Sequence, residues 1–130
     1  MRQILFRGKR LDNGQWVYGD LMHDNIGGIY VFPNDAENLY KEYRIHPETL
    51  GEFTGLTDKN GNKIFEGDIL SFNPQRFDNK LVVWYDNNAA FYLSVYINPT
   101  PSTLTPIWAG GIDKYTILSN IHDNPELIEK

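Results

Sequence analysis

Apolar and polar residues alternate along most of this chain, and a period of two is typical of β-strands that bury one face. In the stretch Ala90 to Ile97, the residues in step with Phe91 and Leu93 are apolar, while the residues between them carry hydroxyl groups. The run Leu81 to Tyr85 precedes this stretch, and the turn-forming sequence Asp-Asn-Asn at 86–88 separates the two, which predicts a β-hairpin. Similar runs predict strands at Ile4 to Gly8, Gln15 to Met22, Ile29 to Phe32, Lys63 to Phe72 and Tyr115 to Ile121.

Helical patterns in this sequence are short. Asn34 can cap a brief amphipathic turn that reaches Tyr40, and Pro47 suits the first helical position of the segment His46 to Thr49. Neither segment exceeds about two turns, which is too short for a helix that must be stable by itself. The sequence therefore predicts a mainly β fold with little helix.

The most patterned stretch runs from Thr54 to Leu70 and reads TGLTDKNGNKIFEGDIL. A calcium loop of the EF-hand type is excluded, because a loop starting at Asp58 would place Lys63 where a glycine is needed and Ile69 where a bidentate Glu is needed. A phosphate-binding loop is excluded as well, because the glycines are one residue too far apart and no Lys-Ser or Lys-Thr pair follows them.

Asn60 and Gly61 lie in the middle of this stretch. An Asn-Gly pair is the preferred centre of a type I′ turn, in which both central residues have positive φ. We therefore expect a tight hairpin turn at Asn60 and Gly61, joining strands at Gly55 to Asp58 and Lys63 to Phe65.

Composition limits the kinds of protein that this chain can be. The 130 residues include no cysteine, which excludes disulfides, thiol catalysis and zinc–thiolate sites and fits a reducing, intracellular setting. Met1 is not followed by an apolar signal segment, and no run of about 18 apolar residues occurs, so we expect a soluble protein without a membrane partner. The net charge of −5 argues against a general nucleic-acid surface, and we interpret Arg2, Arg7, Lys9 and Arg10 as solvated strand ends.

Candidate catalytic or metal-binding residues are few. The tripeptide His-Asp-Asn occurs at His23 to Asn25 and again at His122 to Asn124; two such corners could hold a metal if they met, although turns explain them more simply. Glu66 and Asp68 are a second candidate, because two carboxylates on one strand face can transfer protons or bind a hard cation. The alternative is that Asp68, following Gly67, accepts hydrogen bonds from backbone N–H groups. The sequence assigns no catalytic residue, metal or cofactor.

Three segments carry a resemblance to a known family: FRGKRLDNGQWVYGDL, ETLGEFTGLTDKNGNKIFEGDIL and YTILSNIHDNPELIEK. Together they extend over nearly the whole chain, which on this basis resembles the YopX family of phage and prophage proteins. The chain is expected to form a small N-terminal β lobe at residues 1–52 and a second domain at residues 53–130, and the alternative is one compact unit that combines them. The resemblance implies a phage-encoded, mainly β protein. At residues 53–130 it implies an SH3-type barrel that begins near Glu66, Gly67 and Asp68. It implies no activity, and it gives no guide to residues 34–44 and 98–113.

Aromatic residues of the predicted hairpin suggest one binding surface. Trp84, Tyr92 and Tyr96 are expected on the face opposite Phe91 and Leu93. If that face is exposed, it is a contact surface of the kind that small barrels use; if another part of the chain covers it, these residues belong to the core.

The segment Asn98 to Ile112 suggests a second binding surface. Its prolines and threonines predict a long irregular loop within the second domain. The pair Ile107 and Trp108 is an apolar anchor of the kind that dominates interface energetics, so we expect an interaction arm between copies of this chain. The alternative is that Trp108 folds back as a lid on its own domain.

These observations favour a non-catalytic binding or assembly module in the cytoplasm of the bacterial host, forming a homo-oligomer or binding a phage or host protein. The main alternative is a nucleic-acid-associated regulator that uses the basic N-terminal strand and the barrel aromatics. A weaker alternative is a metal-dependent enzyme built on the two His-Asp corners.

Overall fold

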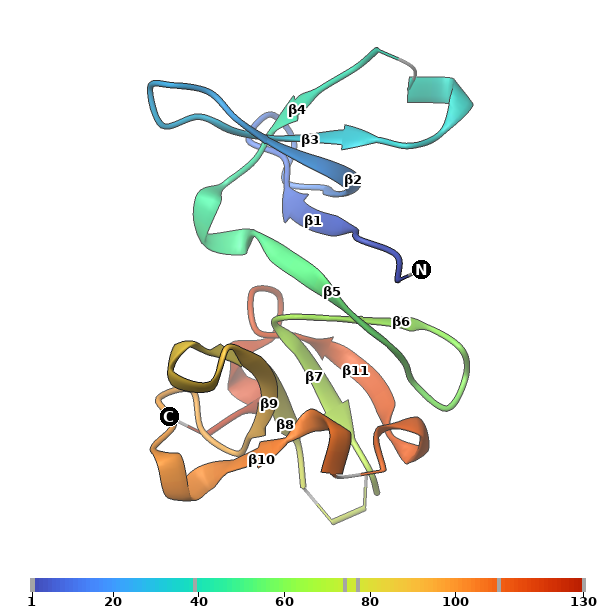
Figure 1. Cartoon of the computed structure of the whole chain (residues 1–130). Coiled ribbons are helices and arrows are strands. Elements are labelled where there is room, and N and C mark those ends of the chain that lie inside the picture. Colours follow the sequence, from blue (N-terminus) through green and yellow to red (C-terminus); the bar gives the residue numbers. More distant parts are fainter. Residues whose placement is uncertain (1, 39, 74, 77, 110, 130) are drawn as a thin grey trace. The chain divides into compact units, whose positions relative to one another are not determined.

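A computed structural model describes residues 2–38, 40–73, 75–76, 78–109 and 111–129 of the chain (Figure 1). The described residues form eleven strands in two antiparallel sheets, and every helical segment among them is a three-residue 3-10 turn. The chain divides into two compact units, Met1–Phe53 and Thr54–Lys130. The prediction of a mainly β fold with little helix is confirmed.

The first unit is built on a meander of antiparallel strands. β1 (Phe6–Lys9), β2 (Trp16–His23), β3 (Ile29–Pro33) and β4 (Tyr43–Arg44) are neighbours in the order β4-β3-β2-β1. The sheet buries Val17, Val31 and Ile45, and Gly8 allows this packing because a Cβ at that position would collide with the side chain of Ile45. The partly buried residues around this core are Ile29, Tyr43 and Leu50.

Strand β5 (Gly51–Thr57) starts in the first unit, where its residues Gly51 and Glu52 pair with β1. It continues into the second unit, where β6 (Lys63–Phe65) follows it in the same sheet. The predicted strand pair around Asn60 and Gly61 is therefore confirmed.

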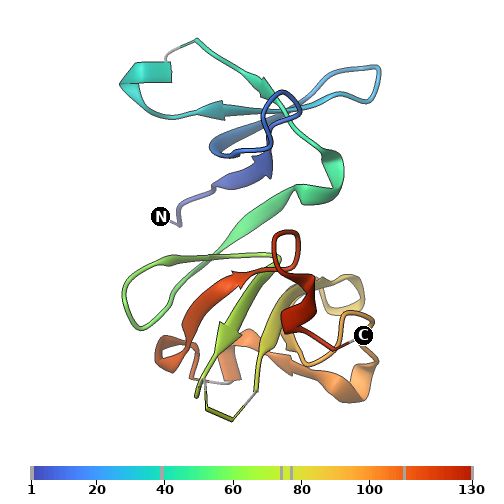
Figure 2. The same ribbon diagram turned by 180° about the vertical axis from the view of Figure 1, so that it is seen from behind.

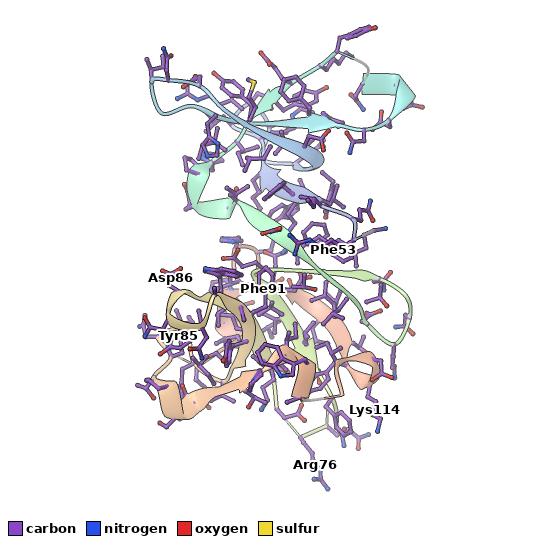
Figure 3. The ribbon with its side chains drawn as sticks, in the orientation of Figure 1. Phe53, Arg76, Tyr85, Asp86, Phe91 and Lys114 are labelled. Carbon is purple, nitrogen blue, oxygen red and sulfur yellow. The ribbon has the colours of Figure 1, made fainter. Side chains whose placement is uncertain are left out.

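The second unit contains a five-stranded sheet in the order β10-β9-β8-β7-β11. Its strands are β7 (Asp68–Ser71), β8 (Lys80–Tyr85), β9 (Ala90–Ser94), β10 (Leu104–Pro106) and β11 (Thr116–Asn120). Strands β8 and β9 form the predicted hairpin, and Figure 3 labels Tyr85, Asp86 and Phe91 at its turn. Figure 2 shows β11 beside β7 from the opposite side.

Both faces of this sheet are covered, which explains why all four residues of β7 are buried and show no alternation. One face packs in a cluster of five buried residues, Ile64, Leu70, Val82, Leu93 and Ile107. The other face packs in a cluster of three, Ile69, Leu81 and Ile128.

The predicted helical turns are shorter than their patterns suggest. The segment 34–40 contributes η1 (Ala36–Asn38), and its residue 39 lies outside the described residues. Pro47 begins η2 (Pro47–Thr49), as predicted. The remaining 3-10 turns are η3 (Asp86–Asn88), η4 (Pro101–Thr103), η5 (Ile107–Ala109), η6 (Ile112–Lys114) and η7 (Pro125–Leu127).

Three expectations about the second unit need correction or lack support. The predicted strand Lys63 to Phe72 is interrupted, because a turn at Glu66 and Gly67 separates β6 from β7. The SH3-type barrel is not confirmed, because no pairing within the described residues joins β10 to β11 and the sheet stays open.

The segment 98–112 is not an irregular loop, since it contains η4, β10 and η5. Pro106 fits β10 because an edge strand tolerates the missing N–H of proline.

None of the helical segments in the described ranges is long and apolar enough to span a lipid bilayer.

Candidate functional site

The turn at Asn60 and Gly61 differs in type from the prediction. Gly61 has a φ of 82°, as expected, but Asn60 does not have a positive φ. The N–H of Asp58 donates to the carbonyl of Asn62 at 2.9 Å, and the N–H of Gly61 donates to the carbonyl of Asp58 at 3.0 Å. The loop is therefore three residues long, with Lys59 as its first member, and it combines a type I turn with a left-handed glycine. The prediction of a two-residue type I′ turn is wrong, because the loop also includes Lys59.

The carboxylate of Asp58 organises this turn. The side chain is 4% exposed, and its Oδ1 accepts hydrogen bonds from the N–H groups of Asn60 and Asn62, both at 2.9 Å. Its Oδ2 accepts a hydrogen bond from the N–H of Ile117 in β11 at 3.2 Å. Burial by itself would raise the pKa of Asp58, but the backbone hydrogen bonds outweigh burial and lower the pKa below its ordinary value of 3.8. The carboxylate oxygens are thus occupied by N–H donors, which is a structural role.

The Glu-Gly-Asp sequence forms the connection between β6 and β7. Gly67 has a φ of 93°, and its N–H donates to the carbonyl of Val82 at 2.8 Å. Asp68 is 2% exposed and accepts a hydrogen bond from the N–H of Phe65 at 2.8 Å, as its structural interpretation predicts. Glu66 lies in the turn, so strand alternation does not pair its carboxylate with that of Asp68.

Both His-Asp-Asn corners lie at turns: His23 ends β2 and Asn25 begins the turn after it, while His122 and Asp123 lie in the turn after β11. Asp24 accepts hydrogen bonds from the N–H of Gly28 at 2.6 Å and from the hydroxyl of Tyr30 at 3.0 Å. Asp123 accepts one from the side-chain amide of Asn120 at 2.8 Å. Residues 23–25 belong to the first unit and residues 122–124 to the second. No group of three metal-ligating side chains occurs within the described part of the chain.

Three aromatic side chains of the second unit form an edge-to-face series, which we call the aromatic row: Tyr85, Tyr92 and Trp108. The ring centroids of Tyr85 and Tyr92 lie 5.5 Å apart, and those of Tyr92 and Trp108 lie 5.7 Å apart. Tyr92 is only 8% exposed, and its hydroxyl is 2.6 Å from the side-chain nitrogen of Asn88. Trp108, in contrast, is 65% exposed. The row therefore presents one exposed indole on a fixed aromatic base.

The predicted grouping of Trp84 with Tyr92 and Tyr96 is wrong. Trp84 lies directly opposite Phe91 in the β8–β9 register, with their ring centroids 5.1 Å apart, so the two side chains share a face. Tyr96 lies beyond β9, where its N–H donates to the hydroxyl oxygen of Ser94 at 3.0 Å. Tyr92 is buried while Trp84 is 43% exposed, so the hairpin face is neither all contact surface nor all core.

Ile107 also departs from its predicted role. It is 5% exposed and belongs to the buried cluster around Val82 and Leu93. Ile107 therefore anchors η5 to its own domain, and Trp108 is the member of the predicted pair that faces solvent.

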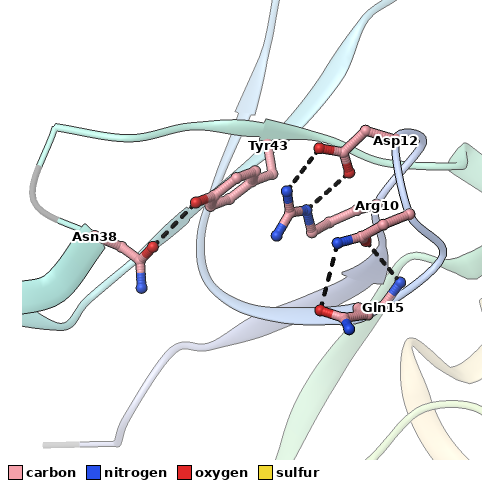
Figure 4. A network of polar contacts seen from close by, with 6 residues as sticks. Arg10, Asp12, Gln15, Asn38 and Tyr43 are labelled. Carbon is pink, nitrogen blue, oxygen red and sulfur yellow. Dashed lines mark hydrogen bonds and ion pairs between the residues drawn. The ribbon is translucent and has the colours of Figure 1, made fainter.

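A cavity in the first unit was not predicted from the sequence. One wall is a chain of polar contacts (Figure 4): Arg10 donates to both carboxylate oxygens of Asp12 at 2.9 and 2.6 Å, and its guanidinium lies 3.8 Å from the ring centroid of Tyr43. The hydroxyl of Tyr43 donates to Asn38 at 3.0 Å, and the side-chain amide of Asn38 donates to Asp35 at 2.8 Å. The cavity has a volume of about 240 Å³ and is lined by Arg10, Trp16, Val17, Tyr18, Pro33, Asp35, Asn38 and Tyr43.

The basic residues of β1 and its following turn lie on aromatic rings. The guanidinium of Arg7 is 4.6 Å and the ammonium of Lys9 is 5.6 Å from the ring centroid of Trp16. Arg7 is 5% exposed, so the interpretation of this residue as a solvated strand end is wrong. The hydrogen bond with Arg10 lowers the pKa of Asp12, and the same hydrogen bond raises the pKa of Arg10. Local sequence patterns could not predict the cavity, because its lining residues come from segments far apart in the chain.

Comparisons with known proteins agree with this fold. The crystal structure of protein EF1440 from Enterococcus faecalis superposes with a TM-score of 0.60 and 21% sequence identity, covering 99% of this chain and 100% of that chain. At this identity the similarity concerns the fold alone. No curated protein matches the chain. The family model described as YopX protein matches residues 5–129, which is nearly the full length, and the chain therefore belongs to the YopX family.

Proposed function

We propose that this protein is a non-catalytic assembly module that associates with copies of its own chain through Trp108. The observation that supports the proposal is the exposure of this indole, at 65%, on top of the buried ring of Tyr92. Tryptophan is enriched among the residues that dominate protein interfaces, because it removes a large apolar area from water at a small loss of side-chain freedom.

The setting of Trp108 strengthens this proposal. Ile107, the preceding residue, is buried in the core, and Tyr92 is itself in contact with Asn88. The indole is therefore held in place before any partner arrives, which lowers the entropy lost on binding. Trp108 follows β10, an edge strand of its sheet. Proline at position 106 weakens this edge as a template for strand addition, which leaves the side chain as the main contact.

We propose that this self-association takes place in the cytoplasm of a bacterial host and that the protein is encoded by a phage or prophage. The support is the resemblance of the three sequence segments to phage and prophage proteins. A phage or host protein that offers an apolar pocket to Trp108 is the alternative partner.

Light scattering on three proteins tests the proposal. The native chain is expected to be an oligomer, and Trp108→Ala is expected to lower its mass to that of a monomer without loss of the folded circular-dichroism spectrum. Trp84→Ala is the matched control, because Trp84 is another partly exposed tryptophan of the same unit and is expected to leave the mass unchanged. An oligomer that persists in Trp108→Ala would assign the interface to another surface.

A further inference from the structure

Two Asn-Gly pairs lie in exposed turns of this chain, and self-association through Trp108 does not use them: Asn13-Gly14 and Asn60-Gly61. Asparagine is among the thermolabile residues of proteins. When glycine follows it, the glycine nitrogen can attack the side-chain carbonyl carbon, because glycine has no side chain to obstruct a close approach. Each pair is therefore a candidate modification site, and the two turns offer a matched comparison.

The two glycines have similar surroundings. Gly14 and Gly61 have φ values of 71° and 82°, and a Cβ added to either would meet no atom within 4 Å outside its chain neighbours. Both N–H groups donate hydrogen bonds, that of Gly14 to the carbonyl of Arg10 at 2.9 Å and that of Gly61 to the carbonyl of Asp58 at 3.0 Å. Each nitrogen must leave its acceptor before it reacts, so the glycines do not distinguish the two sites.

The two asparagine side chains differ. The side-chain carbonyl of Asn13 accepts a hydrogen bond from the N–H of Gln15 at 2.9 Å, and its amide nitrogen lies 3.4 Å from the side-chain oxygen of Gln15. This local turn directs the carbonyl to the residue after the glycine. Within the described ranges, Asn60 is held through its backbone N–H, and no hydrogen bond reaches its side-chain amide. The side chain of Asn60 can therefore rotate towards Gly61 without breaking a contact of its own.

We infer that Asn60 converts to isoaspartate in the folded protein and that Asn13 is protected. The nitrogen of Gly61 forms a bond to Cγ of Asn60, the bond from Cγ to Nδ2 breaks, and the proton of the Gly61 N–H leaves with Nδ2 as ammonia. Water then opens the resulting cyclic imide at one of its two carbonyl groups. One opening gives aspartate, and the other gives isoaspartate, in which the main chain runs through Cγ.

This modification changes the loop that is attached to β11. Oδ1 of Asp58 binds the N–H groups of Asn60 and Asn62, both at 2.9 Å, and isoaspartate inserts one carbon into the main chain between them. It also adds a carboxylate to the loop of Asp58, whose own side chain is 4% exposed. Like charges repel, and a buried acceptor that loses its donors is destabilising, so the contact from Asp58 to Ile117 of β11 should weaken.

Ageing of the native chain in mildly alkaline buffer, beside a sample unfolded in urea, tests this inference. Peptide mass spectrometry follows both conversions, and labelling with an isoaspartyl methyltransferase identifies isoaspartate. In urea we expect both pairs to convert at similar rates, because neither side chain is held by the fold. In the folded chain we expect Asn60 to convert several-fold faster than Asn13. Equal conversion of the two in the folded chain, or no isoaspartate at Asn60 while the unfolded sample converts, would overturn the inference.

Two variants test the effect on the loop. After ageing, the native chain is expected to unfold at a lower urea concentration than before, while Asn60→Ala, which cannot form the cyclic imide, keeps its midpoint. Asn13→Ala is the matched control and is expected to lose stability on ageing as the native chain does. An equal fall in aged Asn60→Ala, or an unchanged midpoint in a native chain that carries isoaspartate at position 60, would contradict this effect.

Discussion

The carboxylate of Asp58 accepts a hydrogen bond from the backbone N–H of Ile117, 59 positions further along the chain, at 3.2 Å. The neighbouring N–H of Lys59 donates to the carbonyl of Tyr115 at 2.9 Å. These contacts attach the loop of the TGLTDKNG motif to β11, an edge strand of the second sheet. The motif that looks most like a ligand loop in the sequence therefore joins two parts of one unit.

Replacing Asp58 tests this structural role. Asp58→Asn removes the charge and at least one acceptor from several buried N–H groups, so we expect a loss of about 1 to 3 kcal/mol in the free energy of unfolding. Urea denaturation measures this loss, and Asp86→Asn, at an exposed position of η3, is the control. An unchanged midpoint in Asp58→Asn would contradict the role.

The same variant has a defined pH dependence. Because the pKa of Asp58 is lowered in the folded state, its contribution is fully present above the unfolded pKa of about 3.9 and is lost as the pH falls through the folded value. The difference in stability between the native chain and Asp58→Asn should therefore shrink below about pH 4. A difference that grows on acidification would have the wrong sign for this carboxylate.

The loop geometry predicts unequal effects of substitution at Asn60 and Gly61. Gly61 has a φ of 82°, so Gly61→Val is expected to lower the free energy of unfolding by about 1 to 2 kcal/mol. Asn60 does not have a positive φ, so Asn60→Ala is expected to change the free energy of unfolding by less than about 0.5 kcal/mol. Similar losses in the free energy of unfolding for both variants would support the type I′ turn instead.

Calcium should not stabilise the protein. The oxygens of Asp58 already accept N–H hydrogen bonds, and a cation would have to displace them. Thermal melts with and without millimolar calcium are expected to give the same midpoint, whereas a ligand that binds the folded state raises it. A rise of several degrees would show that the loop is a metal site.

Random duplex DNA should bind weakly, with a dissociation constant above about 10 μM at physiological salt. The net charge of −5 opposes general attraction, and the basic residues Arg7, Lys9 and Arg10 lie on aromatic rings of the first unit. A fluorescence anisotropy titration measures this affinity. Submicromolar binding that falls steeply with salt would favour the nucleic-acid regulator.

Local sequence patterns predicted the individual strands of this fold better than they predicted which strands pair and in which register. Alternation and turn residues located the β8–β9 hairpin, but alternation describes each strand separately and does not fix the register between strands. Trp84 was assigned to the wrong face for this reason, because the pairing of Tyr85 with Ala90 places it opposite Phe91. The strand β10 was missed because its proline resembles a loop residue, and only its place at the sheet edge makes that proline acceptable.

The candidate sites also show that local sequence can identify a single residue but not the distant residues that it contacts in the fold. Trp108 could be singled out because a tryptophan in a polar segment is conspicuous within one stretch of sequence. The burial of Ile107 beside it depends on β8 and β9, which are distant in the chain. The cavity wall joins Arg10, Asn38 and Tyr43 through contacts that no local spacing encodes.

The molar mass of the native chain at tens of micromolar, measured by light scattering beside that of Trp108→Ala, tests the assembly role most directly. We predict an oligomer for the native chain and a folded monomer for the variant. Trp108→Ala also removes the ring contact with Tyr92, so its melting temperature should fall by only a few degrees, in line with about 0.5 to 1.5 kcal/mol for an aromatic pair. A monomeric native chain at these concentrations would contradict the account.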